Sequence, residues 1–157
     1  MDINNPPRSF GVFKPVDHTV VTFRSSAALE SAAGALLAQG FFAEDLTRYS
    51  PAQMLAQSES DLQTASPLAS MGQELNLVKA YRDLAQQGCS FLVVHAPDDL
   101  QIATLTQVAK AANAQAAQRY GSFIIEELIA PSEDEVQTTE SPAKGLDLAT
   151  DGLNRPG

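Results

Sequence analysis

The chain has 157 residues, which leaves room for one domain with tails, because a single hydrophobic core usually occupies about 100 to 200 residues. Its 10 Lys and Arg against 19 Asp and Glu give a net charge of −9, which disfavours nucleic acid and anionic membrane as general ligands. The single cysteine excludes an internal disulfide, and no Cys/His pattern has the spacing of a zinc site.

The first part of the chain predicts an arm, a strand and a helix. Residues 1–17 contain three prolines around a few apolar residues, which is typical of an extended arm without regular structure. This segment also lacks the basic and apolar stretches of a secretory signal, so we expect a cytoplasmic protein. The β-branched run 19–23 predicts a strand, and a serine pair then caps a helix over 26–39, which Gly40 ends.

The middle of the chain predicts a short strand, two helices and a loop. Residues 46–49 form the strand, and a Ser-Pro pair opens a helix of about two turns over 51–56. Residues 58–70 are polar and predict a loop of about a dozen residues. A helix over 71–87 follows, with one apolar stripe and a terminal glycine.

The next elements predict the centre of a sheet. Residues 90–95 are the most apolar run and indicate a strand buried on both faces. A helix over 98–112 follows, with Asn113 as a left-handed C-cap. Residues 116–120 predict another strand, whereas 123–129 fit either a strand or a helix.

After Ala130 the composition changes to proline, serine, threonine and acidic residues. This segment has two basic and six acidic residues and few large apolar ones, which predicts a disordered acidic tail over 130–157. The folded domain is therefore expected to span 18–129.

The two halves of this domain repeat each other. Residues 20–23 align with 92–95, and each half ends in an Arg-Tyr pair. Two βαβ units of nearly equal length predict an α+β, ferredoxin-like domain with an antiparallel sheet, helices on one face, and two further helices inserted between the duplicated halves. A flavodoxin-like parallel sheet is the alternative.

One stretch of the first half carries a family resemblance. Val-Val-Thr-Phe at 20–23 is followed by an alanine-rich helix that ends at Gly40-Phe41, and an acidic pair precedes the next strand. Over about 30 residues this pattern resembles the bacterial general stress (heat-induced stress) protein domain. The resemblance implies a small cytoplasmic module tied to stress physiology, with no catalytic residues to carry over.

The residues that could carry catalysis have simpler explanations. Asp98 and Asp99 suit the N-cap and first turn of a helix, and would repel an anion there. Glu126 and Glu127 are adjacent, so their carboxylates diverge. Cys89 has no basic residue close in sequence that would activate its thiol. We therefore expect no enzyme, no cofactor and no metal-ligating set.

Two sets of residues remain as candidate ligand-binding positions. The Arg-Tyr pairs could bind a carboxylate or stack on a base, although repeated tyrosines at strand ends more often close a core. The two histidines fall at adjacent ends of antiparallel strands beside three aspartates, a cluster able to hold a divalent metal or respond to mild acid. Alternatively, each histidine simply caps a strand in partial contact with solvent. The candidate positions are Asp17, His18, Arg48, Tyr49, His95, Asp98, Arg119 and Tyr120.

Two functions are compatible with these features. The first is a non-enzymatic cytoplasmic stress-associated module that acts by self-association, as a homo-oligomer, or by binding a protein partner. The second is a small-molecule-binding regulatory domain with a pocket at the end of the sheet. No nucleic-acid or membrane partner is expected.

Deleting residues 131–157 should leave folding intact, because the segment has too little large apolar surface to contribute to a core. Thermal unfolding of the truncated and full-length chains provides the measurement. A fall in melting temperature of more than a few degrees would show that the tail packs on the domain.

Overall fold

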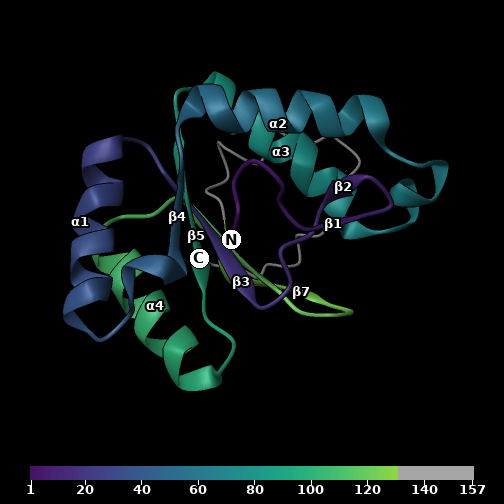
Figure 1. Ribbon diagram of the computed structural model, residues 1–157. Helices are drawn as coiled ribbons and strands as arrows, with labels where there is room; N and C mark the ends of the chain where they lie inside the picture. Colours follow the sequence, from purple (N-terminus) through teal and green to yellow (C-terminus); the bar gives the residue numbers. More distant parts are fainter. Residues whose placement is uncertain (131–157) are drawn as a thin grey trace, which may run out of the picture.

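The computed structural model describes residues 1–130, except for the side chains of Ser70 and Met71. It is an α+β fold in which helices cover both faces of an antiparallel sheet (Figure 1). In chain order the elements are β1 (Arg8–Ser9), β2 (Val12–Phe13), β3 (His18–Phe23), α1 (Ser26–Ala38), η1 (Ala43–Asp45), β4 (Leu46–Tyr49), α2 (Pro51–Thr64), η2 (Pro67–Met71), α3 (Gln73–Gln86), β5 (Ser90–His95), α4 (Asp99–Ala111), β6 (Ala116–Tyr120) and β7 (Ile125–Ile129).

The main sheet has five strands in the order β4-β5-β3-β6-β7. Every neighbouring pair is antiparallel, so the parallel alternative is wrong. β3 lies at the centre, bonded to β5 on one side and β6 on the other. Its register with β5 runs from His18 opposite His95 to Phe23 opposite Ser90.

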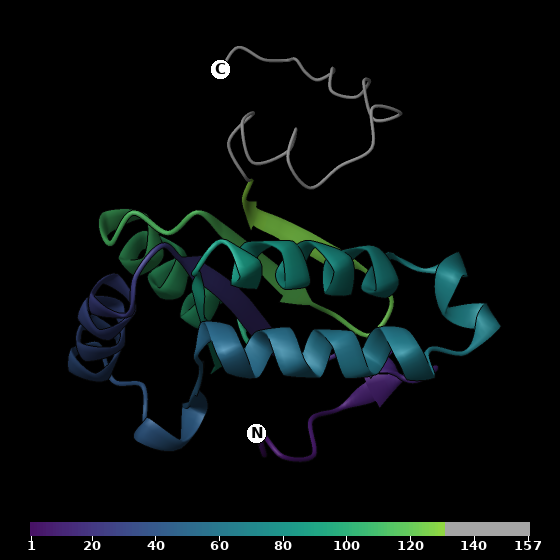
Figure 2. The ribbon, with the colours of Figure 1, turned by 90° about the horizontal axis from the view of Figure 1, so that it is seen from above.

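The helices lie on both faces of this sheet, and the expectation of helices on one face is wrong. α1 and α4 pack side by side on one face, as predicted for those two helices, and α2 and α3 cover the other (Figures 1 and 2). The reason lies in the central strands, whose alternating residues are buried in both directions. Val21 belongs to the core under α1 and α4, whereas Val20 belongs to the core under α2 and α3.

The second helical layer is longer than the sequence pattern indicates. α2 continues to Thr64, so most of the loop expected over 58–70 is helix and the η2 turn. Ser58 and Asp61 are polar but buried on the inner face of α2, one and two turns after the buried Met54. These polar residues interrupt the apolar stripe by which a helix is recognised.

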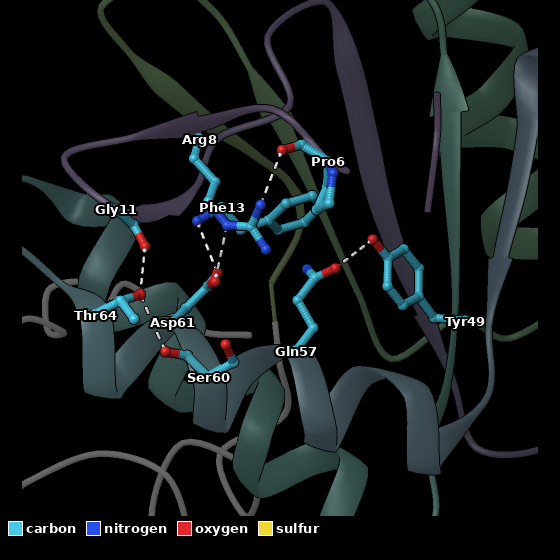
Figure 3. Close-up of polar contacts among 9 residues, drawn as sticks. All are labelled: Pro6, Arg8, Gly11, Phe13, Tyr49, Gln57, Ser60, Asp61 and Thr64. Atoms are coloured by element: carbon cyan, nitrogen blue, oxygen red, sulfur yellow. Dashed lines mark hydrogen bonds and ion pairs between the residues drawn. The ribbon is translucent and has the colours of Figure 1, made fainter. Parts of the chain in front are cut away.

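The N-terminal arm forms a small hairpin, β1 and β2, where no regular structure was expected. It lies against α2, as Figure 3 shows at close range. The Asp61 carboxylate accepts hydrogen bonds from Arg8 Nε and from the Phe13 backbone N–H, both at 3.0 Å. Burial raises the pKa of Asp61, and Arg8 opposes that rise. At the hairpin turn, Gly11 has φ +84° and a Cβ would lie 2.6 Å from Thr64 O, so glycine is required.

The remaining elements follow the sequence closely. Residues 125–129 form strand β7 rather than a helix, and Asn113 has φ +59°, as predicted for a left-handed C-cap. In the described part of the chain, no helix has both the length and the apolar character needed to cross a membrane. The tail predicted over 130–157 lies, beyond Ala130, outside the described residues.

Replacing Asp61 with alanine should destabilise the fold by about 2–4 kcal/mol, because Arg8 loses its partner and the buried Phe13 N–H loses its acceptor. Asp61→Asn keeps an oxygen acceptor and should cost less. Urea unfolding measures both changes, with Glu59→Ala on the exposed side of α2 as a control that should change stability by less than about 0.5 kcal/mol. Equal losses for the two Asp61 variants would contradict the assigned role of the Phe13 hydrogen bond.

Candidate functional site

The two histidines meet at one end of the sheet. His18 begins β3, His95 ends β5, and the two are directly opposite in the register. Their ring centroids are 5.0 Å apart and the rings are inclined by 52°. The approach expected from the antiparallel order is therefore confirmed.

Their spacing follows from the hydrogen-bond pattern of the two strands. The Ala96 N–H donates to Asp17 O at 3.0 Å, so the pair one step along, His18 and His95, occupies a non-hydrogen-bonded position. In such positions the Cα atoms approach to about 4.5 Å and the side chains are closest. Opposite residues also share a face, so both imidazoles project from the same side.

The Nδ1 atom of each ring has a defined neighbour. His18 Nδ1 lies 3.0 Å from Val16 O, and because a carbonyl only accepts, this nitrogen carries the proton. His95 Nδ1 lies 3.5 Å from Asp45 Oδ1. Burial lowers the pKa of His18, the Val16 carbonyl partly opposes that effect, and the nearby His95 lowers the pKa further.

Asp45 is the carboxylate at this site, a position that the sequence reasoning missed. It ends η1 immediately before β4, and Leu46 pairs with Val94, so Asp45 falls opposite His95. The signal that could have found it is the ferredoxin-like order, in which the strand at 46–49 pairs with the strand at 90–95. The exact register of this pairing could not be read from the sequence, and a shift of one residue changes which side chain faces His95.

The three aspartates expected at the site do not gather with the histidines into one cluster. Asp98 caps α4, its Oδ1 accepting from Gln101 N at 2.8 Å, and Asp99 pairs with Arg119 at 3.0 Å. Asp17 adopts a left-handed conformation, φ +66°, and its N–H donates to Tyr120 O. Within residues 1–130, no group of three His, Cys, Asp or Glu side chains could hold a metal ion. The predicted cluster of two imidazoles and three aspartates does not form.

The two arginines do not converge on a ligand. Arg48 donates to both Glu30 carboxylate oxygens, at 2.7 and 3.0 Å, and Arg119 donates to Asp99 and to Pro97 O. They lie on β4 and β6, with β5 and β3 between them. Each joins a strand to the helix before it, which is a structural use of the guanidinium group.

The tyrosines of the two Arg-Tyr pairs close a core on the opposite face. Tyr49 OH donates to Gln57 Oε1 at 2.6 Å, and Tyr120 OH lies 3.0 Å from Tyr81 OH. The structural interpretation of the repeated tyrosines is therefore supported. Tyr81 of α3 joins them by donating to Gln118 Oε1 at 2.9 Å.

Burial controls the ionisation of all three phenols. It raises the pKa of Tyr49 to about 12, and it raises the pKa values of Tyr81 and Tyr120 as well. The phenols therefore stay neutral near pH 7 and act as hydrogen-bonding groups of the core. None of them is poised as a base or a nucleophile.

Two other features offer little chemistry. Cys89 is buried, with its Sγ 3.3 Å from Gln115 Oε1, so the thiol lies inside the core.

A shallow groove of about 230 Å³ runs between α1 and α4. It is lined by small or uncharged residues, namely Ser31, Ala32, Ala35, Gln107, Val108, Ala111 and Ala112. Such a lining has no charged group to orient a small-molecule substrate.

The folded protein should show no tyrosinate absorbance near pH 10, where the three phenols of the unfolded chain ionise. Because the folded state holds these protons longer, stability is full below pH 10 and falls as the pH rises above it, by up to about 1.4 kcal/mol per pH unit for each phenol. Ultraviolet titration and urea unfolding at alkaline pH measure the two effects. Tyr49→Phe should reduce the loss of stability, and tyrosinate forming near pH 10 in the folded protein would contradict the assignment.

Comparison with known proteins leaves function to be inferred from this geometry. No family model, no curated protein and no solved structure matches the chain. The resemblance to the general stress protein domain stays a prediction.

Proposed function

We propose that this chain is a non-enzymatic module that acts by self-association, with a second copy of itself as the partner. The observation that carries the proposal is a group of large apolar side chains exposed at one end of the molecule. We call it the apolar rim, and it consists of Phe10, Leu68, Phe123 and Ile124.

The apolar rim belongs to three connections that hydrogen bonds hold together. The Ser66 N–H donates to Phe10 O at 2.9 Å, which ties the β1–β2 turn to η2. Lys14 Nζ donates to Ser122 O at 3.1 Å, which ties the β6–β7 turn to the arm. Both ribbon views place these connections at the same end of the molecule (Figures 1 and 2).

The degree of exposure separates the apolar rim from ordinary surface residues. Phe123 is 98% exposed and Ile124 is 72% exposed, while Phe10 and Leu68 are each more than half exposed. Single exposed apolar residues are common on soluble proteins, but grouped large ones mark interaction sites.

The absence of charged residues from the segments of the apolar rim permits a second copy as the occupant. The chain carries −9, so two copies repel each other at long range. The segments that bear the apolar rim, 9–12, 65–69 and 121–125, contain no charged residue. These segments therefore bring no like charges together, and the nearby Lys14 is paired with Glu74 at 3.4 Å. An isologous contact uses the same patch twice.

The polar residues support a non-enzymatic role. Arg48 and Arg119 are paired with acids on α1 and α4, and the hydroxyls of the three tyrosines bond inside the core. These groups are occupied in holding the fold. The alternative function, a regulatory domain with a pocket at the end of the sheet, gains no support from the groove between α1 and α4, because that groove lies between two helices.

We further propose that β3-α1-β4 and β5-α4-β6 are duplicated halves of a ferredoxin-like domain. The strand order supports this, because β5 lies between β3 and β4, and β3 lies between β5 and β6. The contacts also repeat: each Arg pairs with an acid on the preceding helix, and Tyr49 and Tyr120 each lie 6.2 Å from Phe13 between ring centroids. A cytoplasmic role in stress physiology rests on the resemblance and stays a prediction.

The particle mass in solution tests self-association. Sedimentation at increasing concentration should show wild type approaching twice its 16.7 kDa, and Phe123→Ser with Ile124→Ser should raise the dissociation constant by about 30-fold or more. Leu100→Ser is the matched control, because Leu100 is 82% exposed at the start of α4, outside the apolar rim. A wild-type monomer at every concentration, or an equal effect of the control, would contradict the proposal.

A further inference from the structure

We propose that His18 and His95 together bind one divalent first-row transition metal ion, such as Zn²⁺, Ni²⁺ or Cu²⁺, through their Nε2 atoms at the end of the sheet. Water completes the coordination, because no third His, Cys, Asp or Glu within residues 1–130 joins them as a ligand. This inference is independent of self-association through the apolar rim.

The first argument is the rigidity of the pair. Two central strands fix the backbones of the histidines, and their ring centroids lie 5.0 Å apart. A metal ion bridges two imidazoles with metal–nitrogen distances of about 2.0–2.1 Å, which requires rings that are already adjacent. The non-hydrogen-bonded position supplies that adjacency.

The second argument is the orientation of the rings. Histidines that bind metal usually direct the other ring nitrogen to a carbonyl or carboxylate, which fixes the tautomer and raises ligand basicity. Both arrangements are present here, with Val16 O beside His18 Nδ1 and Asp45 Oδ1 beside His95 Nδ1. No residue in the described part of the chain hydrogen-bonds to Nε2 of either ring, so both lone pairs remain available.

The third argument is access and charge. The His95 side chain is 45% exposed, which leaves a path from solvent to the pair. Asp45 and Asp17 place negative charge beside the histidines, and the chain as a whole is acidic, so a cation is attracted to this end.

The donor set selects the class of ion. Imidazole nitrogen suits zinc, copper and nickel, whereas calcium and magnesium require oxygen ligands. Two protein ligands leave at least two positions for water, so the ion exchanges readily and binds more weakly than in a structural zinc site with four protein ligands.

Titration of the full chain, carrying no histidine tag, with Zn²⁺ in a calorimeter tests the site. Wild type should bind one ion per chain, and His95→Asn should bind at least about tenfold more weakly. Asp98→Asn is the matched control: it removes a carboxylate that is already engaged as the N-cap of α4, asparagine caps a helix equally well, and affinity should stay within about twofold. Unchanged melting temperatures without metal establish that each variant is folded.

Cu²⁺ provides a second measurement that depends on the ligand atoms. Electron paramagnetic resonance should show two imidazole nitrogens on copper in wild type and fewer in His95→Asn. If the His18→Asn variant folds, it should show the same loss of a nitrogen ligand. If it does not fold, the His95→Asn variant alone decides the test. The absence of saturable Zn²⁺ binding, or equal binding by wild type and His95→Asn, would overturn the proposal.

Discussion

The architecture depends on one constraint, which is that the two central strands carry apolar side chains on both faces. In β3 and β5 the alternating valines belong to two separate cores, with Val20 and Val93 on one side and Val21 and Val94 on the other. A face left exposed to water would lose the favourable free energy of burial, about 25 cal/mol for every Å² of apolar surface. A single layer of helices therefore could not complete this fold, and the chain supplies α1 and α4 for one face and α2, α3 and the arm for the other.

The alternation of the strands also determines what the Arg-Tyr pairs do. Adjacent strand residues point to opposite faces, so each arginine reaches the helix of its own unit while each tyrosine enters the second core. Phe13 of the arm lies between Tyr49 and Tyr120, and Asp61 holds the arm in place through Arg8 and the Phe13 amide. The arm, α2, β4 and β6 thus depend on one another, although the arm and β6 are far apart in sequence.

The histidine pair lies on the same sheet but outside its two hydrophobic cores. It lies where β3 begins and β5 ends, and the His95 side chain is 45% exposed. The cross-strand register brings the imidazoles together, and the neighbouring carbonyl and carboxylate orient them. This combination of a rigid frame and unused nitrogen lone pairs distinguishes the site from the arginines and tyrosines, whose polar atoms are already engaged.

Much of this fold could be predicted from local patterns. The continuous apolar run at 90–95, the caps of α1 and α4, and the left-handed Asn113 are properties of short segments, so the sequence by itself determined these elements. The meeting of His18 and His95 also followed, because an antiparallel order places the start of one strand beside the end of the other. The helices at 51–56 and 71–87 followed as well, but the extension of α2 to Thr64 did not, since Ser58 and Asp61 are polar and the burial of Asp61 becomes favourable only when the arm supplies it with hydrogen-bond donors. Nor did Asp45, because the β4–β5 register is decided by hydrogen bonds between distant segments, and a shift of one residue would put a different side chain opposite His95.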